Sequence, residues 1–201
     1  MKRSAADRMR IAAVLCGAAA SLPWLLGYAY SRGYDLFLWV YNAWFLRQSI
    51  ATGHFPNWSP FSGSGQPFFK IAALSDGLLL AGLSAVLGTW GGVKAYVLLG
   101  YVLAALGTYL LARRLFGNSI ASLISSAAYS LSWYLSITVY FQGYLSNFMS
   151  YALLPYFVLF LLEAFEDRRL DRCIAAAWIL CLCITSNPQV AIKVMGLGLA
   201  F

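Results

Sequence analysis

The sequence is poor in charged residues, and acidic residues are the scarcest of them. Charged residues make up 10% of the 201 positions, with 7 Asp and Glu against 14 Lys and Arg. So few charges cannot coat a water-soluble domain of this size, and the hydrophobic content excludes an intrinsically disordered chain. A composition that is 61% hydrophobic, with a mean hydropathy of +0.71, indicates an integral membrane protein.

The residue patterns of several common sites are also missing. The chain has one histidine, His54, which excludes a histidine-rich metal site. The four cysteines lie in apolar runs, and Cys181-x-Cys183 lacks the second ligand pair of a zinc site. The net charge of +7 does not indicate nucleic acid as a partner, because the basic residues form short clusters between apolar runs.

Long apolar runs predict an all-α protein, a polytopic transmembrane helix bundle. A hydrocarbon core about 30 Å thick requires roughly 20 mainly apolar residues in a helix. The predicted spans are about 11–30, 93–112, 119–137, 147–164 and 173–186. The first is interpreted as an uncleaved anchor, because its apolar run continues past the small residues that could form a signal-peptide cleavage site.

A shorter apolar run after Pro188 ends at Phe201 and is too short to cross a membrane. We therefore expect residues 1–201 to be the N-terminal part of a single membrane domain that is truncated at its C-terminus.

The basic residues decide how residues 71–88 are interpreted. This stretch is apolar, but it contains Asp76, and a charge at bilayer depth costs a few kcal/mol. If the stretch does not cross, nine of the 14 Lys and Arg lie on the side of the N-terminus, whereas six do if it crosses. The positive-inside rule favours the first arrangement, with the N-terminus in the cytoplasm. We expect the protein to lie in the plasma membrane. Residues 71–88 are then expected to lie along the outer face or to dip into it.

This topology leaves a long first outer loop, about residues 31–92, which we expect to contain interfacial or re-entrant helices. Residues 35–50 have the length and aromatic content of an amphipathic helix in the membrane interface. Trp39, Trp44 and Phe45 are its expected anchors. The turn-rich residues that follow, up to Pro67, exclude a regular helix there.

Asp35 is the most informative residue of the outer loop. It lies just beyond the outer end of the first span, close to the membrane surface. A carboxylate at this position can deprotonate an acceptor, or hold a divalent cation against a phosphate. It can also cap the helix that follows, since aspartate is favoured at a helix N-terminus. The residues alone leave both roles open.

Other polar side chains of the outer face are candidates for substrate binding. Cationic ones can meet a lipid phosphate, although simple exposure to solvent or lipid headgroups is the favoured explanation. Asp76 is either paired or functional, or it caps a helix that starts at Gly77. The candidate substrate-binding residues are Arg32, Asn42, His54, Trp58, Gln66, Lys70, Asp76, Gln189 and Lys193.

Several short stretches occur in an order that resembles a known family. They are Gly33-Tyr34-Asp35, residues 53–60 and Gly65-Gln66-Pro67 in the outer loop, residues 107–117 at a cytoplasmic helix end, and Asn187-Pro188-Gln189 at a later outer turn. In this order they resemble the polytopic GT-C glycosyltransferases, and most closely the YfhO-like and pyruvoyl-tetrahydropterin-synthase-related membrane proteins grouped near them.

The resemblance implies a glycosyltransferase whose donor is a sugar carried on polyprenyl phosphate, with membrane lipids as further partners. It places the catalytic acid of the first outer loop at Asp35. Residues 138–147 contain no second acid, so a divalent cation held by two carboxylates is disfavoured, and no other cofactor is expected. The alternatives are a transporter or flippase for lipid-linked glycans and a non-catalytic membrane assembly subunit.

The charge distribution predicts which loops share a side of the membrane. In a full-length variant without native cysteines, a cysteine at Ser62 should react with an impermeant thiol reagent added outside the cell. A cysteine at Asn118, beside the cytoplasmic Arg113-Arg114 pair, should react only after permeabilisation. Labelling of Asn118 in intact cells would contradict the topology.

Overall fold

The chain folds almost entirely into helices. The computed structural model describes residues 5–27, 34–54, 58–59, 66–67 and 74–198. The elements are α1 (Ala5–Leu25), α2 (Tyr34–Ala51), β1 (Trp58–Ser59), β2 (Gln66–Pro67), α3 (Leu74–Phe116), α4 (Ser119–Ser130), α5 (Trp133–Ile137), a π-helix η1 (Thr138–Gln142), α6 (Leu145–Glu166), α7 (Leu170–Ser186) and α8 (Pro188–Gly198). The two short strands pair antiparallel. The predicted helical class is confirmed.

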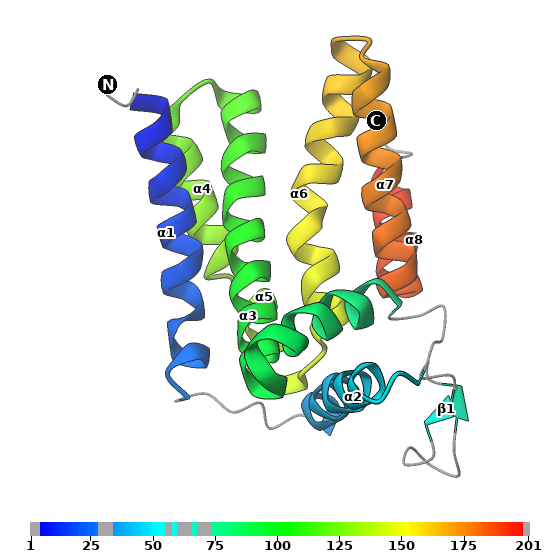
Figure 1. The fold of residues 1–201 in the computed structure, drawn as a ribbon. Coiled ribbons are helices and arrows are strands. Elements are labelled where there is room, and N and C mark those ends of the chain that lie inside the picture. The colour runs from blue at the N-terminus through cyan, green and yellow to red at the C-terminus, as the bar shows by residue number, and fades with distance from the viewer. Residues whose placement is uncertain (1–4, 28–33, 55–57, 60–65, 68–73, 199–201) are drawn as a thin grey trace.

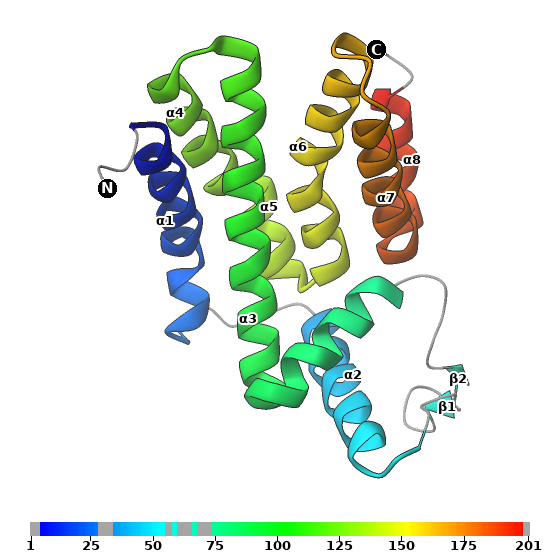
Figure 2. The ribbon, with the colours of Figure 1, turned by 45° about the horizontal axis from the view of Figure 1, so that its top comes forward.

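Three helical stretches of the described residues are long and apolar enough to cross a membrane: Ser75–Phe116, Ser119–Gln142 and Leu145–Glu166. They include three of the five predicted spans. The other two predicted spans correspond to α1, of 21 residues, and α7, of 17 residues. Both run alongside the long helices (Figures 1 and 2).

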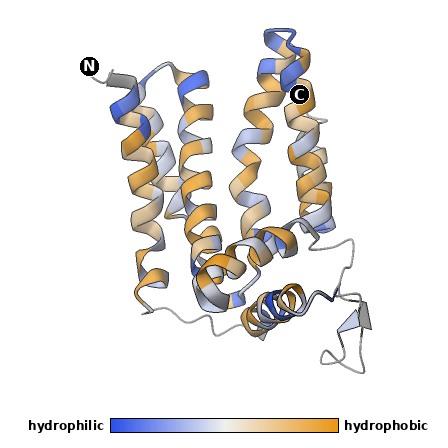
Figure 3. Ribbon diagram, in the orientation of Figure 1, coloured by the Kyte–Doolittle hydropathy of each residue, from blue (hydrophilic) through white to orange (hydrophobic). Residues whose placement is uncertain are grey.

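Hydrophilic residues collect at the end of the bundle where α1 begins, α3 meets α4 and α6 meets α7 (Figure 3). There Arg114 pairs with Glu166 at 2.9 Å and with Asp167 at 2.7 Å, which joins the α3 end to the α6–α7 turn. The predicted grouping of Arg113-Arg114 with residues 168–172 at the N-terminal end is confirmed. Whether this end is cytoplasmic stays a prediction.

α3 consists of two arms joined at Gly88. Gly88 has φ 76° and ψ 168°, which glycine adopts without the steric cost of a side chain. The first arm, residues 74–88, lies across the end of the bundle, and the second arm runs along it (Figures 1 and 2). This is the orientation expected of a segment along a membrane surface. Residues 71–73 lie outside the described residues, and the position relative to a membrane stays a prediction.

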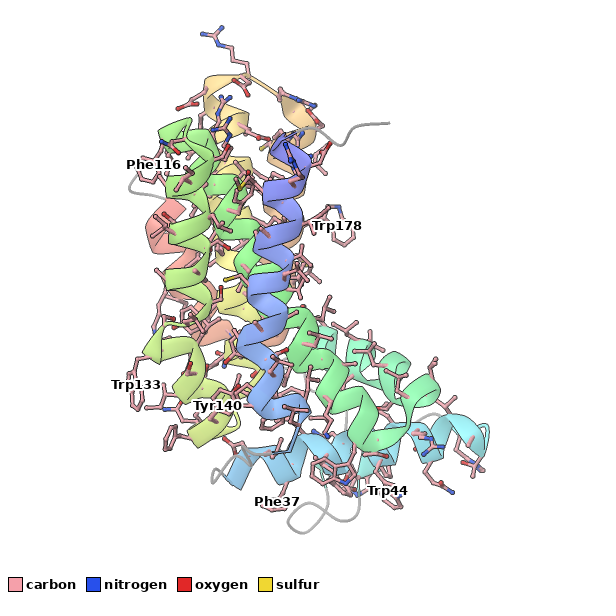
Figure 4. The ribbon with its side chains drawn as sticks, turned by 90° about the vertical axis from the view of Figure 1, so that its left-hand side faces the viewer. Phe37, Trp44, Phe116, Trp133, Tyr140 and Trp178 are labelled. Atoms are coloured by element: carbon pink, nitrogen blue, oxygen red, sulfur yellow. The ribbon has the colours of Figure 1, made fainter. Side chains whose placement is uncertain are left out.

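The helix predicted at residues 35–50 is observed as α2, which also lies across the end of the bundle (Figure 1). Leu36, Trp39 and Ala43 follow helical spacing and pack into the core with the first arm of α3. The prediction that Trp39 is an interfacial anchor is wrong, because this side chain is 7% exposed and faces the bundle. Phe37 and Trp44 are exposed instead and lie at this end of the molecule (Figure 4).

The span predicted at residues 119–137 is broken rather than continuous. α4 ends at Ser130, and Ser132 caps the short helix α5 by accepting a hydrogen bond from the Leu135 amide at 3.4 Å. Serine favours such caps because its hydroxyl competes for backbone groups. A π-helix, η1, then closes at Gly143, which has φ 71°.

The second arm of α3 is the centre of the bundle and packs against α1, α4 and α6. Small residues permit this close packing. A Cβ on Gly17 would lie 2.5 Å from the Tyr101 carbonyl oxygen, and a Cβ on Gly100 would overlap the Phe148 ring. The rings of Tyr101 and Phe148 lie 4.9 Å apart between centroids.

Replacing Gly17 with alanine should destabilise the bundle. The added methyl group meets backbone atoms of α3, which cannot rotate away, so we expect a loss of about 1–3 kcal/mol and a lower Tm. Gly82→Ala is the matched control, because no atom lies within 4 Å of its added Cβ. Alanine there should be neutral, or stabilising by up to about 1 kcal/mol. Equal Tm values for both variants in a thermal melt would contradict the packing.

Candidate functional site

A buried carboxylate, that of Asp76, lies where the first arm of α3 reaches the rest of the bundle. Asp76 is 2% exposed. One carboxylate oxygen accepts a hydrogen bond from the Tyr96 hydroxyl at 2.6 Å, and the other accepts one from the Ser186 hydroxyl. These donors lie on the second arm of α3 and at the end of α7. Asp76 therefore ties three helical segments together.

The network continues into α6 and α8. The Ser150 hydroxyl of α6 donates to Ser186 at 3.2 Å. Next to Ser186, the Asn187 amide donates to the side-chain oxygen of Asn147. The side-chain oxygen of Asn187 also accepts a hydrogen bond from the backbone amide of Gln189 at 2.9 Å and so caps α8. Pro188 then occupies the first position of α8, where a missing amide proton costs nothing.

The interpretation of Asp76 as the cap of a helix starting at Gly77 is wrong. α3 begins at Leu74, so Asp76 lies inside the first turn. Both of its oxygens bond to side chains from other segments. The structure gives this acid two hydroxyl donors within the protein, and no ion pair of the described residues includes it.

A cavity of about 300 Å³ opens beside Asp76. Its polar lining consists of Ser75, Asp76 and Ser186. The rest of the lining is apolar and includes Leu103, Leu153 and Leu182. Ligand pockets commonly combine an apolar wall with a few polar groups in this way.

Asp35 lies in the first turn of α2, where its negative charge is favourable to the helix dipole. The helix starts at Tyr34, so Asp35 is not the cap residue itself. Its neighbour Leu36 packs into the same core cluster as Leu80 and Tyr96. Partial burial raises the pKa of the Asp35 carboxyl above its ordinary value.

A second cavity, of about 430 Å³, lies between α2 and the residues that follow the kink of α3. Its walls include Phe37, Tyr41, Trp44 and Trp90. The Tyr41 hydroxyl shares a hydrogen bond of 2.6 Å with Ser59 of β1, which ties the strand pair to α2. We name these four aromatic residues the aromatic groove.

The remaining predicted binding residues do not form one cluster. His54 is exposed in the turn after α2, and Asn42 is half-buried on α2. Trp58 is exposed on β1, and the exposed Gln189 lies in the first turn of α8. Lys193 donates to the Tyr151 hydroxyl at 3.3 Å.

Arg32 and Lys70 lie outside the described residues, as does the side chain of Gln66, although its backbone pairs in β2. Of the predicted site residues, the structure places Asp76 in a network and a cavity and leaves Asp35 in a separate position on α2.

Sequence reasoning missed the partners of Asp76, which are Tyr96 and Ser186, and also Ser150, which donates to Ser186. Tyr96 is 20 residues from Asp76 in the chain, and Ser186 is 110 residues away. They lie on separate stretches of mainly apolar helix, among other hydroxyl residues, so no motif joins them. The signal that could have found the site is Asp76 itself, because a buried acid requires hydrogen-bond donors.

The part of the chain that the structure describes contains no group of three or more His, Cys, Asp or Glu side chains placed to hold a metal ion. All four cysteines are free thiols.

No protein-family model, curated protein or solved structure matches the chain.

The Asp76 network predicts a difference between two tyrosine variants. Tyr96→Phe removes a buried donor and leaves a carboxylate oxygen of Asp76 short of one hydrogen bond, so we expect a loss of about 1–3 kcal/mol. Tyr134→Phe is the control, because it removes a hydrogen bond between exposed hydroxyls, to Tyr151. Thermal melts should show a clearly lower Tm for Tyr96→Phe. A larger effect of Tyr134→Phe would contradict the network.

Proposed function

We propose that this protein is a GT-C-like membrane glycosyltransferase, which transfers a sugar from a polyprenyl-phosphate carrier to an acceptor at the outer membrane face. The observation that carries the proposal is the position of Asp35. It is a partly buried carboxylate in the first turn of α2, a helix that follows α1 and lies across the end of the bundle (Figure 1). The resemblance seen in the sequence assigns the catalytic acid to this residue.

The chemistry of Asp35 suits a general base. A base works best when its pKa is closer to the working pH than that of an exposed aspartate, and partial burial moves the pKa of Asp35 in that direction. The ionised carboxylate would accept the proton of an acceptor hydroxyl as the new glycosidic bond forms and the carrier phosphate leaves. The exposed Arg47 at the same end supplies positive charge near such a phosphate.

The two transverse segments have surfaces suited to a membrane interface. Val86, near the kink of α3, is 83% exposed, and Trp44 of α2 is 45% exposed. Trp133 also projects from the molecule at this end (Figure 4). Aromatic side chains are enriched at the headgroup level of membranes. If α2 and the first arm lie at the headgroup level, Asp35 lies at the depth of the phosphate group of a lipid-linked donor.

The distribution of charge favours a transferase over a transporter. Transporters place ionisable residues near the bilayer midplane along the substrate path. In the described residues of α1, α3, α6 and α7, the charged side chains lie in the end turns, apart from Lys94 beside the kink. Lys94 donates to the carbonyl oxygen of Leu25 at 2.9 Å and so closes the end of α1.

Asp35→Asn should abolish most transfer and leave the fold intact. A general base contributes a factor of about 100 to 10,000 in rate, whereas the helix-terminal charge contributes at most about 1 kcal/mol of stability. Transfer from a polyprenyl-linked sugar would be measured with the full-length protein, with Tm followed in parallel. Because burial raises the pKa of Asp35, the acid limb of the wild-type rate profile should lie above about pH 3.9, the ordinary aspartate value.

Asp171→Asn is the matched control for this variant. Asp171 is exposed at the opposite end of the bundle and pairs with Arg169 at 2.7 Å. A surface ion pair of this kind contributes little to stability, so both rate and Tm should stay near wild type. If Asp35→Asn transfers at the wild-type rate with a normal Tm, Asp35 is a helix-terminal charge alone and the proposal loses its catalytic residue.

A further inference from the structure

The cavity beside Asp76 contains an acid for which the described residues provide no partner charge. None of the ion pairs among them includes Asp76. Of the Lys and Arg side chains described at this end of the bundle, Lys94 bonds to the carbonyl oxygen of Leu25, Lys193 bonds to the Tyr151 hydroxyl, and Arg47 is exposed on α2. A carboxylate out of water is costly without a partner charge, so the cavity favours a cationic group.

The carboxylate retains capacity for such a group. An ionised carboxylate offers about four lone-pair sites, and Tyr96 and Ser186 occupy one on each oxygen. Both hydroxyls also have a second acceptor close by. The Leu145 carbonyl oxygen lies 3.4 Å from the Tyr96 hydroxyl, and the Ser146 carbonyl oxygen lies 3.1 Å from the Ser186 hydroxyl. Either hydroxyl can therefore turn to a carbonyl and release an oxygen of Asp76.

Polarity changes along the cavity in one direction. Its polar residues, Asp76 and Ser186 among them, lie at the end of the bundle where α7 finishes. Leu103 lies about four helical turns beyond the kink of α3, and Leu153 lies about two turns into α6. The cavity wall is therefore polar near α2 and apolar within the bundle. This polarity matches a membrane amphiphile, which has a polar head and an apolar chain.

We propose that this cavity binds a single-chain amphiphile with a protonated amine head, with the ammonium group on Asp76 and the hydrocarbon chain against Leu103, Leu153 and Leu182. A volume of about 300 Å³ is at the small end for a ligand pocket and suits one chain. The ammonium group donates up to three hydrogen bonds, and the carboxylate and the Ser75 hydroxyl can accept them. This binding site is independent of transfer by Asp35.

The test uses three ligands that share one chain and differ in the head: decylamine, decanol and decanoate. The full-length protein is placed in nanodiscs of phosphatidylglycerol, which has no amine, and Tm is measured against each ligand. Decylamine should raise Tm the most and decanoate the least. Asp76→Asn should weaken decylamine binding by about tenfold to hundredfold, the value of a charge-assisted hydrogen bond.

A second variant keeps the test valid if Asp76→Asn folds poorly. Leu153→Trp fills the apolar part of the cavity without altering Asp76 and should abolish the Tm rise with decylamine and decanol alike. Ile124→Trp is its control, because Ile124 is exposed on α4, away from the cavity lining. A diazirine-labelled decylamine should also crosslink to peptides that contain Leu153 or Leu182.

Further arms separate the sources of the amine. Nanodiscs that contain lysophosphatidylethanolamine, which has one acyl chain, should raise Tm and reduce the decylamine effect if the natural ligand is a lipid, and should leave both unchanged if it is a free amine. Equal Tm shifts for all three heads, or an unchanged amine preference in Asp76→Asn, would overturn the proposal. A Tm rise with sodium chloride but none with decylamine would assign the site to a metal cation and also overturn it.

Discussion

The hydrogen bonds of Asp76 hold the first arm of α3, which lies across the end of the bundle, to the helices that run along the bundle. In a bundle surrounded by hydrocarbon, a polar group must find its partners within the protein. Asp76 finds them on the second arm of α3 and at the end of α7, and through Ser186 it reaches α6. The kink at Gly88 turns the first arm across the bundle, and the Asp76 carboxylate then fixes the position of the N-terminal turn of that arm.

The two ends of the bundle expose different kinds of side chain. At the end where α1 begins, arginines and acids are exposed and pair with one another, as between Arg114 and Asp167. At the other end, charges are few, and aromatic and aliphatic side chains are exposed on α2 and the first arm. Such a difference suits a protein whose one end faces water and whose other end meets lipid headgroups. The aromatic groove and the Asp76 cavity both open within this second region.

The sequence predicts the helices well because the apolar runs are long and the turn residues between them are clear. It predicts α2 and α6 nearly to the residue, and basic-residue counting groups Arg113-Arg114 with residues 168–172. It fails where tertiary contacts decide: Trp39 is buried because α2 packs on α3, and the break after Ser130 has no proline or glycine to mark it. The partners of Asp76 cannot be predicted either, since single hydroxyls on separate helices carry no pattern of spacing.

Two aspartates at one end of the bundle have different surroundings, and this suggests different roles. Asp76 is enclosed by hydroxyl donors, so its charge is available to a group that enters the cavity and not to a substrate at the surface. Asp35 is half-buried on a transverse helix, where burial raises its pKa, and the proposed substrate would approach it from outside the bundle. A carboxylate that accepts a proton during transfer needs such access, whereas one that anchors a cation needs enclosure. In the two proposals, Asp35 is accordingly the group for proton transfer and Asp76 the group for binding.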